Sequence, residues 1–422
     1  MGAYRSLHRS PEGTVMTLTP SDFTADARVR TAVAHATECV RTQPPSDLKD
    51  DAGHAYVDLV LEGGGVLGIA LVGYTYVLEQ AGLRFRAIAG TSAGAINALL
   101  LAACGRPHEA RSEHVLAALA AMPLGSFLDG DADARDFSRA LSRRAGSVKL
   151  FWKGAQVLDN LREDLGLHPG IQFATWLEER LAEHGVRSLA ELETRIAIDK
   201  SGPHRLRTER RDVDVSSLDG ELAIVAADAT FHRKVVLPRM ADQYYDHPAR
   251  VNPARFVRAS MAVPLFFAPA RSDRSPEPTV CRQSLLVDGG VLYNFPIGIF
   301  HRHDCVPAAP TFGVKLELDR FAPIETPLHM VSAIFDTARS GLQEDFLLDN
   351  PDYRHLVANI DTGDAHYWLD FELSADAKHD LFVRGAQRAA AFLGDFDWEG
   401  YKEVRRLKAE VRRASPERKS LY

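Results

Sequence analysis

The sequence of 422 residues contains little cysteine. Its four cysteines are far apart in the chain, at Cys39, Cys104, Cys281 and Cys305. This spacing offers neither a disulfide framework nor the C-x-x-C pair of a zinc site. The 16 histidines also lack the H-E-x-x-H spacing of a catalytic metal site. The sequence therefore predicts neither a metal nor another cofactor.

Long apolar runs are absent too. The longest, from Val66 to Leu78, contains two glycines and ends before Glu79. It is shorter than the stretch of about 18 apolar residues that marks a membrane-spanning helix. The segment from Met1 to Arg30 is polar and lacks the apolar core of a secretory signal peptide. We therefore expect a cytoplasmic protein or one held peripherally at a membrane, and secretion by a non-standard route stays open.

The sequence also has no excess of positive charge. Its 57 acidic and 50 basic residues give a formal net charge of -7. Such a chain has no general attraction to nucleic acid or to an anionic membrane, so any basic surface must be local. One basic cluster lies between Tyr401 and Lys419, where eight Lys and Arg residues accompany three glutamates. It predicts an exposed helix, with contact to anionic lipid as the alternative.

The order of the predicted elements indicates an α/β protein. Tyr56–Leu61 fits a buried strand, and the helical segment Leu67–Gln80 follows it after a run of glycines. The short strand Arg86–Ala89 and the helix Ala93–Ala103 repeat this pattern. Such alternation predicts a mostly parallel sheet with helices on its faces.

Later parts of the chain continue the pattern less regularly. Further strands are expected at Leu222–Ala226, Lys234–Leu237, Leu285–Val287 and Phe312–Leu318. The clearest amphipathic helix of the middle region spans Phe173–His184. We divide the chain into an N-terminal arm (residues 1–52), a main domain with the candidate site (53–320) and a mainly helical C-terminal segment with a basic tail (321–422). The last segment should pack on the main domain.

A serine between glycines occupies the second strand-to-helix turn. Gly90-Thr91-Ser92-Ala93-Gly94 fits G-x-S-x-G, in which small neighbours allow a tight turn that presents the serine. The backbone NH of this serine lies at a helix N-terminus, where developing negative charge is favoured. Ser92 is therefore the candidate nucleophile.

The first turn carries a glycine run that suits an oxyanion. Gly63, Gly64, Gly65 and Val66 follow the first strand, and Gly68 lies in the next turn. Successive NH groups without side chains form a concave donor site. The same glycines fit G-x-G-x-x-G, but the place where a dinucleotide site needs its acidic residue leads into the serine turn. We favour an oxyanion hole over a nucleotide site.

A carboxylate flanked by glycines follows a later strand. In Asp288-Gly289-Gly290, the small neighbours allow the aspartate to approach another strand end closely. All three glycine-rich elements follow strands, and parallel sheets place their sites at the carboxyl ends of strands. We therefore expect Asp288 to lie near Ser92 at such an edge.

These three motifs, in this order, resemble the patatin-like phospholipases. The resemblance covers roughly Val57–Phe300 and includes the Ala-Ser-x-Ala-x-Pro pattern within Arg258–Phe267. It implies a three-layer α/β/α sandwich, Ser92 as nucleophile and Asp288 as the direct general base of a Ser-Asp dyad. The family commonly has Arg or Lys where this chain has Leu67, so a cation beside the oxyanion is missing here.

The resemblance implies hydrolysis of acyl esters of glycerolipids, phospholipids or lysophospholipids through an acyl-enzyme. A lipid transacylase using the same dyad and a non-catalytic lipid-binding module stay open as alternatives. A Ser-Asp-His triad would need one of the histidines after Asp288, which are His301, His303, His329, His355, His366 and His379. The basic and aromatic segment Val148–Lys153 is a candidate for lipid contact. The sequence gives no indication of the oligomeric state.

Overall fold

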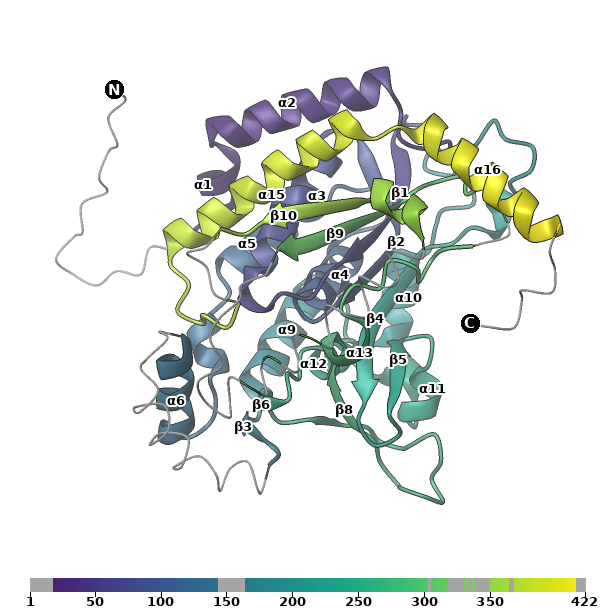
Figure 1. Cartoon of the computed structure of the whole chain (residues 1–422). Coiled ribbons are helices and arrows are strands. Elements are labelled where there is room, and N and C mark those ends of the chain that lie inside the picture. The colour runs from purple at the N-terminus through teal and green to yellow at the C-terminus, as the bar shows by residue number, and fades with distance from the viewer. Residues whose placement is uncertain are drawn as a thin grey trace, which may run out of the picture.

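A computed structural model describes residues 18–142, 164–302, 305–317, 350–363 and 368–414, together with residues 330, 333 and 337. Figure 1 shows a central sheet between layers of helices. The strands of this sheet are β1 (Ala55–Leu61), β2 (Leu83–Thr91), β4 (Glu221–Asp228), β5 (Arg233–Leu237), β7 (Ala270–Arg271), β8 (Leu285–Asp288), β9 (Thr311–Glu317) and β10 (Val357–Asp361). Their order is β10-β9-β1-β2-β4-β8-β7, and β5 pairs with β4 outside this path.

The centre of the sheet is parallel and buried. Strands β10, β9, β1, β2 and β4 run parallel to one another, whereas β5 and β8 are antiparallel to β4. Every residue of β1 is buried, as expected for a strand covered on both faces. The predicted mostly parallel α/β/α sandwich is confirmed.

Two helical layers cover the sheet (Figure 1). One layer contains α2 (Ala27–Thr42), α3 (Ile69–Gln80) and α15 (Ala375–Asp395), and the other contains α4 (Ala93–Cys104), α9 (Ile171–Glu183), α10 (Leu189–Ile196) and α12 (Ala254–Ser260). Two glycines bring α3 and α15 into backbone contact. A Cβ atom at Gly73 would lie 2.0 Å from Phe382 O, and one at Gly385 would lie 1.9 Å from Ala70 O.

The remaining elements are short or peripheral. They are the helices α1 (Pro20–Thr24), α5 (Ser112–Ala120), α6 (Ala132–Ser142), α11 (Ala241–Tyr244), α13 (Gly290–Tyr293) and α16 (Trp398–Ala414) and the strands β3 (Gly166–His168) and β6 (Leu265–Phe267). Strands β3 and β6 form a separate two-stranded sheet. Helix α16 is only partly exposed, because Tyr401 and Arg405 on its inner side are buried. Within the described ranges, no helix is both long and apolar enough to cross a bilayer.

The strands predicted from the sequence are present, most of them within two residues of the expected bounds, whereas β3, β6, β7 and β10 are not predicted. Strand β2 begins at Leu83 rather than Arg86, because Leu83 and Phe85 are buried and pair with Ala55 and Val57 of β1. Strand β10 is not predicted by the sequence pattern, since it is a short edge strand with Asn359 and Asp361 exposed. It adds residues beyond position 320 to the central sheet, and the three-part division of the chain stays a prediction.

A buried histidine joins β3 to the turn before α6. His168 is fully buried, its Nδ1 accepts a hydrogen bond from the Gly130 amide (2.9 Å), and its Nε2 contacts Ser138 Oγ (2.7 Å). Because Nδ1 is an acceptor, Nε2 carries the hydrogen and donates a hydrogen bond to the Ser138 hydroxyl. Burial lowers the pKa of His168 to about 4, and the nearby Asp129 only partly opposes this. The folded protein therefore holds this ring neutral.

We predict that stability falls on mild acidification because of His168. The unfolded chain protonates this residue near the ordinary histidine pKa of 6.5, whereas the folded chain resists protonation down to about pH 4. The unfolded state thus binds more protons in this window, and the free energy of unfolding should fall by about 2 kcal/mol between pH 7 and pH 5. Urea unfolding should show a smaller fall for His168→Gln. An unchanged fall in that variant, matching the exposed control His355→Gln, would assign the effect to other groups.

Candidate active site

The ends of β2 and β8 meet along one edge of β4. Thr91, the last residue of β2, is paired with Val225, and Asp288, the last residue of β8, is paired with the next residue, Ala226. Strand β5 occupies the opposite edge of β4 at both positions. Strands β2 and β8 therefore run toward each other, and Ser92 and Asp288 leave them at the same point.

This arrangement corrects one expectation from the sequence. The motifs predict Asp288 at the carboxyl edge of parallel strands, but β8 is antiparallel to β4. Strand β8 starts beyond the end of β2, where its second residue, Leu286, pairs with Asp228, and it runs back toward β2. The aspartate reaches the level of the serine because β4 extends farther than β2, and not because the two strands share a direction.

Ser92 occupies a strained turn. Its φ of 52° and ψ of -119° are unusual for a residue with a side chain. Two glycines permit the turn, because a Cβ at Gly90 would lie 2.2 Å from Gly94 O and one at Gly94 would lie 2.2 Å from Leu61 O. The serine precedes α4 and is 7% exposed. The sequence motif therefore has the backbone geometry of a nucleophile turn.

Asp288 is held beside this turn by backbone contacts. It is 2% exposed, and its Oδ1 accepts a hydrogen bond from the Gly290 amide (2.7 Å). A Cβ at Gly289 would lie 2.3 Å from Val225 O and 3.0 Å from Thr91 Cγ2. Only glycine allows this close approach, so the Asp-Gly-Gly sequence brings the carboxylate up to the end of β2.

The end of α12 and the residues that follow it bind both turns at once. The Ser92 amide donates to Ser260 Oγ (2.9 Å), and that hydroxyl donates to Val225 O (2.6 Å). Two residues farther on, Ala262 O accepts the Asp288 amide (2.9 Å). In the sequence this segment stands out only as part of the resemblance. The contacts give it a role in holding the serine and the aspartate at a fixed separation.

The glycine run lies against the serine, but its amides differ in what they bind. The Gly63 amide donates to Asn294 O (3.3 Å) and the Val66 amide donates to Trp368 O (2.9 Å). Within the described part of the chain, no acceptor is bonded to the amides of Gly64 and Gly65. These two NH groups are therefore available to an acceptor that is not part of the described chain.

Tight packing fixes the conformation of the run. A Cβ at Gly63 would lie 3.1 Å from Ser92 Cβ, and Gly65 has a positive φ of 58°. Gly68 permits close packing on α4, where an added Cβ would lie 3.1 Å from Asn97 Nδ2. Leu67 is fully buried in the core. A cation at that position would be removed from water, which explains physically why an apolar residue fits here.

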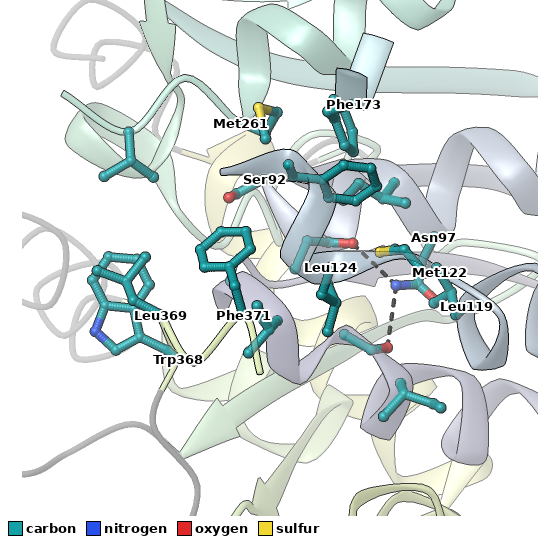
Figure 2. Close-up of a pocket in the computed structure, with 18 of the residues that line it drawn as sticks. Ser92, Asn97, Leu119, Met122, Leu124, Phe173, Met261, Trp368, Leu369 and Phe371 are labelled. Carbon is teal, nitrogen blue, oxygen red and sulfur yellow. Dashed lines mark hydrogen bonds between the residues drawn. The ribbon is translucent and has the colours of Figure 1, made fainter. Parts of the chain in front are cut away.

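An apolar pocket opens at Ser92. Figure 2 shows its side chains around the serine hydroxyl, with Leu119 and Met122 at the end farther from it. The other aliphatic and aromatic lining side chains are Val66, Ile69, Ala93, Ile96, Leu124, Phe127, Phe173, Met261, Val263, Phe267, Trp368, Leu369 and Phe371. Lys378 also contributes, but its Nζ donates to Ala120 O (2.9 Å) at the end of α5. Such a lining suits a hydrocarbon chain.

The described histidines do not line this pocket. The His301 ring packs against Tyr353 at a tilt and contacts Arg405, and His379 stacks on Phe23. His355 is exposed. The other candidates for a triad, His303, His329 and His366, lie outside the described residues, as does the segment Val148–Lys153.

A comparison with known families decides the relationship. The sequence profile of the patatin-like phospholipases matches residues 59–301, more than half of the chain. The chain belongs to this family. The resemblance seen in the sequence is thereby confirmed, and the matched region contains Ser92, Asp288 and the glycine run. The patatin-like assignment covers the family, and the roles of the individual residues stay proposals.

Individual relatives of this patatin-like chain add little on function. The protein YqhO of Bacillus subtilis, described as uncharacterized, is 29% identical over 350 residues, which cover 80% of this chain and 98% of YqhO. Among solved structures, VipD from Legionella pneumophila matches with a TM-score of 0.41 and 17% identity over 83% of this chain and 70% of VipD. The type III effector ExoU matches with a TM-score of 0.34 and 16% identity, covering 85% and 54% of the two chains.

We predict that Ser260 positions the nucleophile turn. Ser260→Ala removes the acceptor of the Ser92 amide, and a lost hydrogen bond of this kind should slow the reaction of Ser92 with a fluorophosphonate by about five- to tenfold. Ser260→Thr keeps the hydroxyl and should restore most of the rate. Labelling reactions quenched at successive times measure this rate directly. A lower melting temperature with an unchanged labelling rate would show that Ser260 supports only the fold.

Proposed function

We propose that this protein is a serine acyl hydrolase that cleaves acyl esters of lipids through a Ser92-Asp288 dyad. The observation that carries the proposal is the position of Ser92. This residue lines an apolar pocket, and the strand that ends at Asp288 meets the strand that leads into Ser92. Family membership supports the same chemistry. The substrate class proposed is a glycerolipid, phospholipid or lysophospholipid.

The proposed first step forms an acyl-enzyme. Asp288 takes the proton of the Ser92 hydroxyl as Oγ attacks the ester carbonyl carbon. The carbonyl oxygen gains the negative charge and is stabilised by amide NH groups of the glycine run, for which Gly64 and Gly65 are best placed. The C–O bond to the alcohol then breaks, and Asp288 returns its proton to the leaving oxygen.

The second step restores the enzyme. Asp288 takes a proton from a water molecule as the water oxygen attacks the acyl carbon. The bond from that carbon to Ser92 Oγ then breaks, Asp288 gives the proton to Oγ, and the fatty acid leaves. A carboxylate is an intrinsically weak base for a hydroxyl group. Close approach and the exclusion of water must therefore supply the rate, and the burial of Ser92 and Asp288 supports this requirement.

We predict that Asp288→Asn lowers kcat on a soluble ester by about 10²- to 10⁴-fold, because it removes the base while keeping the side-chain shape. Ser92→Ala should abolish both turnover and labelling by a fluorophosphonate. Single replacement of His301, His303, His329, His355, His366 or His379 by Gln should leave most of the activity. A folded His variant with no activity, together with a mild effect of Asp288→Asn, would instead identify a triad.

We also predict that the pocket limits the length of the acyl chain. Leu124 is only partly buried and lines the pocket, so Leu124→Trp can fill it with little disturbance of the core. The preference for long over short p-nitrophenyl esters, measured as a ratio of kcat/KM values, should fall by more than about tenfold. Leu407→Trp on the exposed side of α16 serves as the matched control. An equal loss for short and long esters would place the acyl chain elsewhere.

A further inference from the structure

Exposed aliphatic side chains lie on the small sheet beside the pocket. Leu165, which precedes β3, is 43% exposed, and Leu265, the first residue of β6, is 37% exposed. The two are neighbours, because β3 and β6 are parallel with Gly166 opposite Leu265. Ile171, at the start of α9, is 64% exposed and follows β3 by three residues. We call Leu165, Leu265 and Ile171 the rim residues.

The backbone at the two leucines is unfavourable as well. Leu165 has a φ of 60° and Leu265 a φ of 67°, in the left-handed region that residues with branched side chains rarely adopt. An exposed leucine in that conformation gains neither burial nor backbone stability. Both features are expected where a side chain is kept for contact with something outside the fold.

The rim residues are close in the chain to residues that line the pocket. Val263 and Phe267, two residues to either side of Leu265, line it, and so does Phe173, two residues after Ile171. Docking at the rim would therefore bring this part of the pocket wall close to the lipid layer. Figure 1 shows β3, β6 and α9 in the lower part of the molecule, away from α16.

The charges near the rim indicate which lipid surface fits. Asp164 is exposed next to Leu165, and the carboxylate of Asp129 accepts the amides of Gly170 and Gln172 on either side of Ile171. The nearby Arg258 is turned inward, where its Nη2 donates to Pro169 O (2.6 Å) and Ala268 O (2.7 Å). These carboxylates would be repelled by an anionic layer.

We propose that the rim residues dock the protein onto a zwitterionic lipid surface by inserting their side chains among the acyl chains. This inference rests on the proposed function, because it names the surface from which a lipid-cleaving Ser92 would draw its substrate. Attraction comes from apolar contact and not from charge, so docking should persist in high salt.

Vesicle flotation of the Ser92→Ala protein tests docking apart from catalysis. It should bind phosphatidylcholine vesicles in 0.1 M and in 1 M NaCl. The double variant Leu165→Asn/Leu265→Asn, made in the same background, should bind at least tenfold more weakly, and adding Ile171→Ser should weaken binding further. Asparagine tolerates a positive φ, so these changes should not lower the melting temperature. Leu407→Asn/Val411→Asn replaces equally exposed residues of α16 and should bind as the parent does.

Activity measurements separate the two proposals. With Ser92 present, the rim variant should cleave soluble p-nitrophenyl butyrate normally and vesicle lipid at least tenfold more slowly. Cleavage of butyrate without vesicle binding would overturn docking and leave the proposed function standing. Rim-dependent vesicle binding without any ester cleavage would overturn the proposed function and leave docking standing. Binding lost only in the α16 variant, binding that needs anionic lipid, or a dimer that the rim variant converts to monomer would each overturn the docking proposal.

Discussion

The candidate site depends on the hydrogen-bond register of β4. This strand extends past the last residue of β2, so its final residues can pair with a second strand that runs in the opposite direction. Because Val225 pairs with Thr91 and Ala226 pairs with Asp288, one step along β4 fixes how far apart the two strand ends lie. A shift of β8 by one residue would turn its side chains to the other face of the sheet.

The same junction explains why small residues gather there. Three chain segments meet the end of β2, and each has a glycine where a side chain would overlap a neighbour, as at Gly63, Gly94 and Gly289. The strained conformation of Ser92 persists because hydrogen bonds hold it from outside, including the bond from its amide to Ser260. The geometry of the candidate site and the close packing at this junction therefore depend on the same glycines.

Local signals in the sequence are enough to predict six strands of the central sheet, the serine turn and the position of the glycine run, since each depends on a few adjacent residues. Contacts between segments that are far apart in the chain cannot be predicted from such local signals. The antiparallel direction of β8 depends on how the chain returns after Phe267, and no spacing in the sequence reports it. The contact of Ser260 with Ser92 joins residues 168 positions apart, and Trp368 O reaches the Val66 amide from the C-terminal segment.

The contact between Trp368 and the glycine run has a consequence for how the protein can be divided. The family match ends at residue 301, before β9, which covers one edge of β1, and before Trp368 and Phe371, which form part of the pocket wall. A fragment cut at the limits of that match would leave β1 as an unprotected apolar edge and the pocket open on one side. The family match therefore marks the part of the chain that contains the candidate site, whereas the packing around that site also needs residues as far as α15.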